Sequence, residues 1–387
     1  MISGMTIHSR FPGNRNIRSR CAGWRRGQEP ERKSVYAAKA ARHRGRSCVA
    51  VFLLAGIRTD APGSIWPDYE MGVEQMRDAF VRTLMELAKE DKKIELVTGD
   101  LGFGVLKPFW EQLPDQFTNA GIAEQNMTSL AAGMALEGKT VFTYSIGNFP
   151  TLRCLEQIRN DCAYHRANVK IVCVGGGFVY GSLGMSHQAT EDLAVMRALP
   201  DVVVMAPGDL VEAEECTKAI ARYQGTGYLR LGRGGERRIH KRLDGFEIGK
   251  AVKVHDGERV VIFSTGAIFD EVADAYEMLV KKGYRPAVYT FPTVKPIDTQ
   301  IIEQCSKAYE WIVTVEEHNV VAGFGSAVAE IMAEMNGRAA RLMRIGLQDE
   351  YNILVGNQKY LRGQYKLDGK SIANEIEKNL SCVEREY

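Results

Sequence analysis

Residues 119–138, NAGIAEQNMTSLAAGMALEG, place the carboxylate of Glu124 at the start of an apolar helical pattern. Apolar and small residues recur at helical spacing from Ile122 to Ala135, and Gly138 supplies a C-terminal stop. The stretch therefore predicts a buried helix with Glu124 in its first turn. Because helix N-termini favour acidic side chains, Glu124 alone fits a capping role as well as a chemical one.

Length and composition indicate an ordinary globular protein with two domains. The chain has 387 residues, of which 45% are hydrophobic and 25% charged. Its eight cysteines are dispersed and form no CxxC pair, so neither a zinc site nor a disulfide framework is indicated, and a reducing compartment is expected. Residues 1–66 hold 13 Lys and Arg against three Asp and Glu, which leaves a mildly acidic remainder. A nucleic-acid partner is therefore not expected.

The basic segment at the start, residues 1–70, is predicted to be a disordered extension. Its Arg-rich composition also fits an organelle transit peptide, and its only apolar run, residues 48–57, is too short to span a membrane. Because Met71 precedes a normal helical pattern, we prefer an upstream extension or a misassigned start. A cytoplasmic protein without a membrane partner is the expectation.

Strands and helices alternate from residue 71 onward, which predicts parallel sheets covered on both faces. The fold class is therefore α/β, with two consecutive parallel-sheet domains at residues 71–240 and 256–387, and a polar linker at 241–255. The expected strands are residues 94–100, 140–145, 169–177, 201–207, 227–233, 259–267, 286–291, 311–317 and 341–347.

Three strand ends in the first domain carry chemically suggestive residues. Asp100 follows the first strand, His187 and Gln188 close a glycine-dense loop, GGGFVYGSLGMSHQ, and Arg233 ends YLRLGR. Active sites in open α/β sheets lie beyond the carboxyl ends of the strands. A histidine alone is more often structural, but acid, histidine and arginine at neighbouring strand ends favour a catalytic site.

The motifs GIAEQNM, SIGNFPTLRCLEQIRND, GSLGMSHQATEDLAVMRALPDVVVMAPGD and YLRLGR together resemble the pyrimidine-binding domain of the transketolase family, whose enzymes use thiamine diphosphate. The segments VVIFSTGAIFDEVADAYEML, FPTVKPID and VTVEEHNVVAGFGSAVAE resemble that family's C-terminal domain. The sequence contains no GDG motif with a downstream Asn, which holds the metal and diphosphate in the family. The chain thus resembles one subunit of a split transketolase, organised like the β subunits of 2-oxo acid dehydrogenases.

This resemblance implies roles for the residues singled out above. Glu124 would hydrogen-bond the far nitrogen of the aminopyrimidine ring and so promote the imino tautomer that deprotonates the thiazolium carbon. Phe149 would stack on that ring, and Asp100 and Ile146 would line the cofactor site. His187 would move protons beside the substrate, with Gln188 nearby as a second substrate-binding residue. Arg233 would bind a sugar phosphate.

The resemblance also implies a partner subunit that carries the GDG motif and the Mg²⁺ ligands. We expect an α2β2 heterotetramer, in which two copies of this chain meet through the Glu124 helix. The small residues of that helix permit such an approach, because they let another backbone come close; they are Ala131, Ala132, Gly133 and Ala135.

Transfer of a two-carbon ketol unit between sugar phosphates is the favoured activity. Many transketolases have a phosphate-binding histidine where this chain has Gly175, and an acidic residue where it has Leu183, so donor and acceptor are not named. Two alternatives from the same cofactor class are a deoxyxylulose-phosphate-synthase-like carboligase and a 2-oxo acid dehydrogenase β-type subunit. The stretch SHQATED favours the sugar branch over the latter. A non-catalytic assembly subunit is the third alternative, which the retained Glu124 and His187 argue against.

Overall fold

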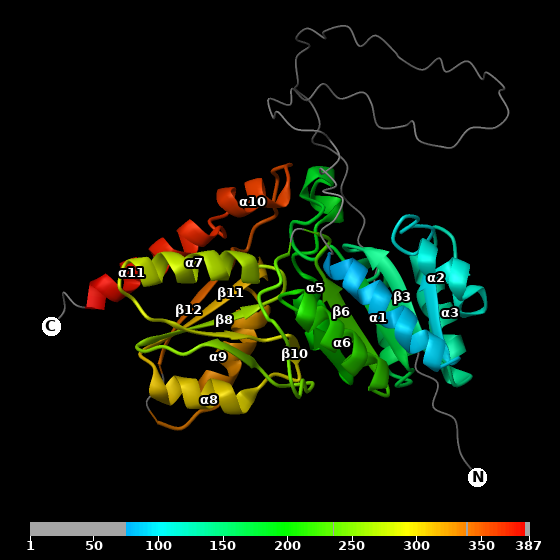
Figure 1. Ribbon diagram of the computed structural model, residues 1–387, viewed down its shortest axis with the longest axis horizontal. Helices are drawn as coiled ribbons and strands as arrows, with labels where there is room; N and C mark the ends of the chain where they lie inside the picture. Colours follow the sequence, from blue (N-terminus) through cyan, green and yellow to red (C-terminus); the bar gives the residue numbers. More distant parts are fainter. Residues whose placement is uncertain (1–74, 235, 338–339, 384–387) are drawn as a thin grey trace, which may run out of the picture. The chain divides into compact units, whose positions relative to one another are not determined.

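Seven strands form the first sheet, in the order β10-β5-β6-β4-β3-β1-β2 (Figure 1). The computed structural model describes residues 75–383 except 235 and 338–339, so the predicted extension 1–70 and the helix start at Met71 lie outside the described residues. All neighbours in this sheet run parallel except β10, which runs antiparallel to β5. The strands are β1 (Ile94–Thr98), β2 (Phe117–Asn119), β3 (Thr140–Ile146), β4 (Val169–Val174), β5 (Val202–Met205), β6 (Thr226–Leu231) and β10 (Thr293–Lys295).

Helices cover both faces of this sheet, as predicted. Adjacent strand residues point to opposite faces, so Leu96 packs with one layer of helices and Val97 with the other. One layer contains α1 (Met76–Glu90), α2 (Lys107–Gln112) and α6 (Leu210–Arg222). The other contains α3 (Glu124–Leu136), α4 (Leu155–Gln157) with the π-helical turn Ile158–Ala163, and α5 (Asp192–Ala198). Five of the seven strands are buried along all or nearly all of their length, which is typical of a parallel sheet between two helical layers.

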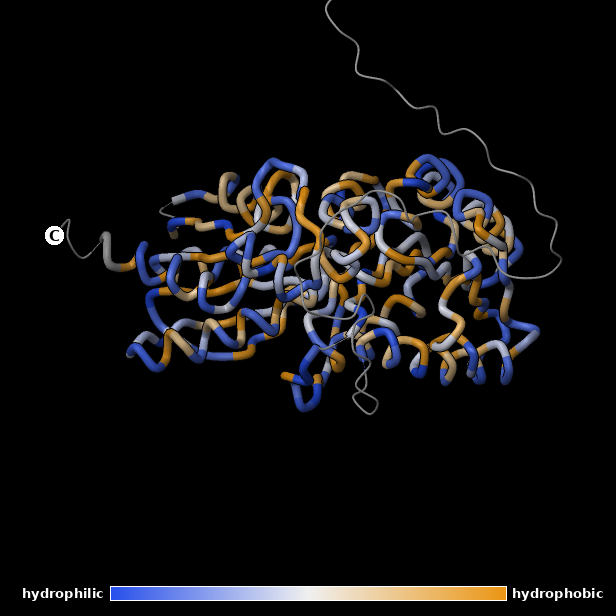
Figure 2. The backbone as a smooth tube through the Cα atoms, turned by 90° about the horizontal axis from the view of Figure 1, so that it is seen from above, coloured by the Kyte–Doolittle hydropathy of each residue, from blue (hydrophilic) through white to orange (hydrophobic). Residues whose placement is uncertain are grey.

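A second sheet has five strands in the order β12-β11-β8-β9-β7. The strands are β7 (Val252–His255), β8 (Val260–Thr265), β9 (Ala287–Thr290), β11 (Trp311–Asn319) and β12 (Arg341–Leu347). In Figure 1, α7 (Phe269–Lys281) and α11 (Gly369–Val383) lie on one side of this sheet, and α8 (Thr299–Ala308) and α9 (Phe324–Glu334) on the other. The helix α10 (Gln358–Gln364) precedes α11 in the chain. Figure 2 shows that hydrophobic and hydrophilic residues alternate along the helices, as expected for helices that bury one face.

Two strands depart from the prediction of consecutive domains joined by a linker. β7 occupies the end of the segment 241–255, which was predicted to be a linker, and pairs antiparallel with β9. β10 follows β9 in the chain but adds to the edge of the first sheet, where Thr293 pairs with Met205. Both strands are too short to give a clear periodic pattern, and their partners are set by tertiary contacts. The two sheets also share one hydrophobic core, which runs from Met127 of α3 to Val328 of α9.

No helix in the described part of the chain is both long enough and apolar enough to cross a membrane.

Candidate functional site

Glu124 begins α3, at the carboxyl end of the first sheet, as predicted. Its side chain is only 4% exposed, and a methyl group placed on Gly99 after β1 would lie 3.5 Å from its Cγ. No side chain caps this helix N-terminus, and Glu124 is the acidic residue of its first turn. The carboxylate is therefore held inside the protein directly beyond β1.

The prediction that the Glu124 helix is buried is correct for one face only. Met127 and Ala131 are fully buried against the sheet, whereas Leu130 and Leu136 are 39% and 60% exposed. Apolar residues therefore occur on the exposed side of the helix as well as on the side that packs against the sheet. The helix thus exposes two leucines at the surface of the single chain.

Arg153 contacts Glu124 from the segment that follows β3. Its Nη1 donates to Glu124 Oε2 at 2.8 Å, and its guanidinium carbon lies 4.1 Å from the centre of the Phe149 ring. Phe149 in turn meets the imidazole of His187 edge to face, with 5.1 Å between ring centres. Residues from three separate segments, after β2, β3 and β4, thus converge on one site.

The loop that carries His187 approaches the end of β3 closely. A methyl group on Gly147 would lie 2.5 Å from the carbonyl oxygen of His187, and Gly147 has a φ of +53°. The side-chain amide of Asn148 donates to the carbonyl oxygen of Gln188. Only glycine allows this approach, so the sequence GN before Phe149 fixes the distance between the ring and the histidine.

Partial burial and the nearby Arg153 lower the pKa of His187 below the usual range for histidine. Its Nδ1 lies 3.0 Å from Ser186 Oγ. The imidazole is therefore neutral at pH 7 and able to accept a proton.

The other two residues predicted for the cofactor lie at the carboxyl ends of β1 and β3. Asp100 is exposed, has a φ of +58°, and exchanges two hydrogen bonds with Asn119 at 3.1 and 3.0 Å. Ile146 is the last residue of β3 and is half-buried. The predicted roles of Asp100 and Ile146 in the cofactor site stay predictions.

The two residues predicted for the substrate besides His187 have different surroundings. Gln188 is 1% exposed, and its carboxamide oxygen accepts from Asn352 Nδ2 at 2.8 Å. Arg233 follows β6 and is half-buried, with its guanidinium carbon 4.9 Å from the centre of the Tyr180 ring. Among the described residues, neither side chain makes a hydrogen bond or ring contact with His187, and both substrate roles stay predictions.

The Tyr180 ring lies against Gly175, the residue at which the resemblance implies a histidine in many transketolases. A methyl group on Gly175 would lie 2.2 Å from the Tyr180 ring, and the φ of Gly175 is +93°. The tyrosine ring thus fills the space that a side chain at residue 175 would need. Tyr180 also carries the guanidinium of Arg233 on its ring.

Buried charged residues of both domains support the glycine-rich loop from below. Arg230 of β6 donates to Asp192 Oδ2 at 2.8 Å and to the carbonyl oxygens of Ala189 and Glu317 at 2.8 and 3.1 Å. The carboxylate of Glu317 accepts from the backbone N–H of Phe178 at 2.6 Å. A side chain at Gly176 or Gly177 would collide with Arg230 or Glu317. The C-terminal domain therefore shapes the loop that ends in His187.

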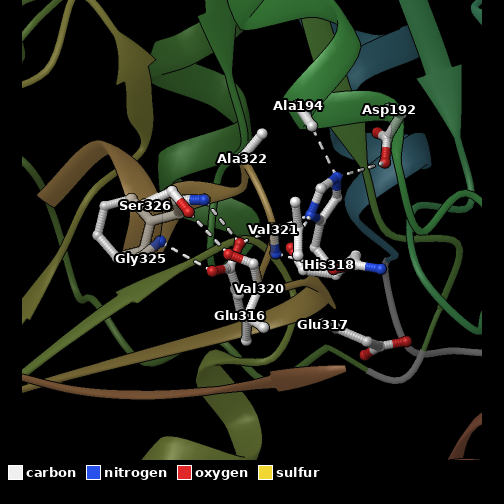
Figure 3. A network of polar contacts seen from close by, with 12 residues as sticks. Asp192, Ala194, Glu316, Glu317, His318, Val320, Val321, Ala322, Gly325 and Ser326 are labelled. Carbon is white, nitrogen blue, oxygen red and sulfur yellow. Dashed lines mark hydrogen bonds and ion pairs between the residues drawn. The ribbon is translucent and has the colours of Figure 1, made fainter. Parts of the chain in front are cut away.

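Figure 3 shows the neighbouring part of this network on β11. Glu316 accepts from the backbone N–H groups of Phe324 and Gly325 at 2.6 and 2.8 Å, at the start of α9. His318 accepts from the backbone N–H of Ala194 at 3.3 Å, and its Nδ1 lies 2.7 Å from the carbonyl oxygen of Asn319. Burial lowers the pKa of His318 to about 4, so this imidazole is neutral and links α5 to β11.

Sequence reasoning missed Arg153 and the supporting pair of Asp192 and Arg230. Arg153 lies within the quoted motif SIGNFPTLRCLEQIRND, but nothing in its local pattern shows that it reaches a carboxylate 29 residues away. Arg230 belongs to the motif YLRLGR, of which only Arg233 was considered. Because side chains alternate between the two faces of a strand, Arg230 could have been predicted to point to the opposite face from its neighbours.

The arrangement can bind a planar heterocycle that donates a hydrogen bond. Glu124 offers a buried carboxylate, and Phe149 offers an aromatic face beside it. The guanidinium of Arg153, itself planar with N–H donors, already makes both contacts, so the residues present fit the aminopyrimidine ring of thiamine diphosphate. No group of three or more His, Cys, Asp or Glu side chains that could bind a metal occurs among the residues described.

Comparison with known proteins identifies the family of both domains. Residues 74–236 match the transketolase pyrimidine-binding domain, and residues 249–372 match the transketolase C-terminal domain. A putative transketolase C-terminal section from Methanocaldococcus jannaschii is 40% identical over 78% of this chain and 95% of its own length. One subunit of the apulose-4-phosphate transketolase from Phocaeicola vulgatus is 36% identical over 76% of this chain and 94% of its own length.

Among solved structures, a split-gene transketolase described as an inactive β4 tetramer is 32% identical, with a TM-score of 0.72 over 80% of this chain and 99% of that chain. The transketolase family depends on thiamine diphosphate. The two domain matches and the close relatives show that this chain belongs to the transketolase family.

Proposed function

We propose that this chain is the subunit of a split transketolase that holds the aminopyrimidine half of thiamine diphosphate. The activity is transfer of a two-carbon ketol unit between sugar phosphates. The observation that carries the proposal is the buried carboxylate of Glu124 beside the Phe149 ring, with the neutral imidazole of His187 against the same ring. Bound there, the cofactor would supply the carbanion-stabilising thiazolium that ketol transfer requires.

Each of these three side chains has a distinct task in the proposal. Glu124 hydrogen-bonds the pyrimidine nitrogen through a carboxyl group that is almost fully buried. Phe149 fixes the plane of the ring by stacking. His187 accepts a proton from a substrate hydroxyl and returns it, because its pKa is lowered and its ring is neutral at pH 7.

A sugar phosphate is the proposed substrate because Arg233 supplies a cation at the strand end beside this site. A guanidinium binds phosphate oxygens through a charge-assisted fork. Arg233 rests on Tyr180, so its stem is positioned while its charge stays available to a ligand.

The proposed partner is a separate subunit with the GDG motif, a downstream Asn and the Mg²⁺ ligands. Relatives named as a C-terminal section and as one subunit of a transketolase support a protein divided in this way. We propose an α2β2 heterotetramer in which the exposed leucines of α3, Leu130 and Leu136, meet a second copy of this chain. The proposed location is the cytoplasm, and the five described cysteines are free thiols, which fits a reducing compartment.

Reconstitution tests this function. The chain, the co-purified partner and their mixture are each assayed with thiamine diphosphate and Mg²⁺ on a panel of ketose phosphates and aldose phosphate acceptors. Only the mixture should transfer the ketol unit. Turnover by the chain alone would refute the divided site, and activity only on pyruvate or another 2-oxo acid would replace the transketolase proposal with one of its alternatives.

A further inference from the structure

Arg153 contacts both groups that the proposed function assigns to the aminopyrimidine ring. Its Nη1 lies 2.8 Å from Glu124 Oε2, and its guanidinium carbon lies 4.1 Å above the Phe149 ring. Its charge also acts on His187, since Arg153 is one of the two causes that lower the pKa of that imidazole. Arg153 thus lies at the centre of the site rather than at its edge.

The guanidinium and an aminopyrimidine ring cannot hold these positions at the same time. Stacked planar groups are separated by about the 4 Å already taken up between Arg153 and Phe149, which leaves no room for a ring between them. The hydrogen bond to Glu124 Oε2 is likewise formed by Arg153. Both groups are planar N–H donors, so the arginine makes the same two kinds of contact as the ring.

We propose that Arg153 is a built-in competitor, which occupies the pyrimidine position of the free subunit and must be displaced before thiamine diphosphate binds. The inference rests on the proposed function, because it takes Glu124 and Phe149 as the pyrimidine site. In the free subunit, the arginine compensates a carboxylate that would otherwise be buried without a partner.

The side chain of Arg153 is able to leave without unfolding its segment. Its side chain is 45% exposed, whereas that of Glu124 is 4% exposed, so the arginine is the mobile member of the pair. Its backbone is fixed at both ends, because its N–H donates to the carbonyl oxygen of Asn148 and its own carbonyl accepts from Gln125 Nε2 at 3.1 Å. Displacement therefore requires only a change of side-chain rotamer toward solvent.

The expected penalty on binding is modest. A half-exposed ion pair and an exposed cation–π contact are each weak, so we expect their joint removal to tighten thiamine diphosphate binding by roughly 3- to 20-fold. The competition should act on affinity and leave the chemistry of Glu124 unchanged.

The test measures the dissociation constant of thiamine diphosphate, with Mg²⁺, for the full chain in complex with its partner, by quenching of intrinsic fluorescence. Arg153→Met removes the charge and the planar group but keeps the length of the side chain. Arg153→Lys keeps the charge and loses the planar fork. Arg159→Met is the matched control, because Arg159 is exposed on the same segment and its guanidinium donates to the neighbouring Asn160. Thermal melting of each variant checks the fold.

The proposal expects tighter binding for Arg153→Met, a smaller gain for Arg153→Lys, and no change for the control. In the Glu124→Gln background the gain from Arg153→Met should shrink, because the ion pair is already broken. Weaker binding for both Arg153 variants would overturn the proposal and make Arg153 a ligand of the cofactor. Unchanged binding would overturn it as well. A wild-type complex that binds no thiamine diphosphate would instead contradict the proposed function.

Discussion

Replacing Asp192 with Asn should destabilise the protein strongly, because it removes the carboxylate that pairs with the buried guanidinium of Arg230. Asp192 is fully buried and Arg230 is 4% exposed, and Asp192 Oδ2 accepts from both Arg230 Nε at 2.8 Å and Tyr228 Oη at 2.5 Å. The substitution keeps the shape and the hydrogen bond from Tyr228, and removes only the charge.

Breaking one partner of a buried ion pair typically costs about 3–5 kcal/mol. We expect the Asp192→Asn variant to fall near this range, since the other contacts of Arg230 are to carbonyl oxygens of Ala189 and Glu317 and supply no counter-charge. At roughly 2 °C per kcal/mol for a protein of this size, the melting temperature should drop by about 6–10 °C.

The assay is urea or thermal unfolding of the full chain, with Arg230→Met and the double variant measured beside it. The double variant holds no buried unpaired charge, so its loss should be smaller than the sum of the two single losses by at least about 1.5 kcal/mol. Asp201→Asn is the matched control, because its pair with Arg166 has side chains 55% and 76% exposed and should change nothing measurable. Additive losses in the double variant would refute the reasoning. A loss of less than about 1 kcal/mol for Asp192→Asn would refute it as well, because a broken buried ion pair should cost more.

Three further predictions concern the site and the pH dependence of folding. Glu124→Gln should preserve folding and partner binding but slow exchange of the thiazolium proton in the reconstituted complex by about 10²- to 10⁴-fold, measured by NMR; wild-type exchange would remove Glu124 from cofactor activation. His187→Ala should mainly lower kcat, whereas Arg233→Ala should mainly raise the KM for phosphorylated sugars and spare unphosphorylated ones; equal losses on both kinds of sugar would exclude Arg233 from the phosphate site. Because burial lowers the pKa of His318 to about 4, its contribution to stability should be complete above the unfolded pKa of about 6.5 and be lost as the pH falls toward 4, by at most about 3 kcal/mol. The buried carboxyls Glu212 and Glu316, with pKa values raised to about 7, act in the opposite direction over the same pH range, so the test compares the wild-type protein with His318→Gln at each pH, and parallel curves would contradict the prediction.

The elements that the sequence predicted correctly are those whose pattern is local. The strand from Ile94 is apolar and short, and α1 shows clear helical spacing at Met76, Phe80 and Leu84, so both could be placed without knowledge of their neighbours. The position of Glu124 in the first turn of α3 follows from the same kind of pattern. Asp100, His187 and Arg233 could be predicted to lie at one edge of the sheet, because each follows the carboxyl end of a parallel strand.

What the sequence could not supply depends on contacts between distant residues. β10 has three residues, and its place in the first sheet is set by pairing with β5, about 90 positions earlier in the chain. The contacts of Arg153 with Glu124 and Phe149 arise from the turn after β3, where arginine has no periodic signature. The sequence could not show that part of α3 is exposed. Apolar side chains in a surface patch cannot be told from those of a core by residue type alone.

The insertion of β10 limits where this polypeptide can be divided. A fragment that ended between β6 and β7 would lose the strand that caps β5, and the exposed edge would present unpaired N–H and C=O groups to other chains. Because β10 comes from the second half of the chain, the first sheet is completed only after about 65 residues beyond β6 have been synthesised. Gene division or domain exchange at the boundary suggested by the sequence would therefore yield an aggregation-prone fragment, and a viable exchange must move β10 together with the sheet that it completes.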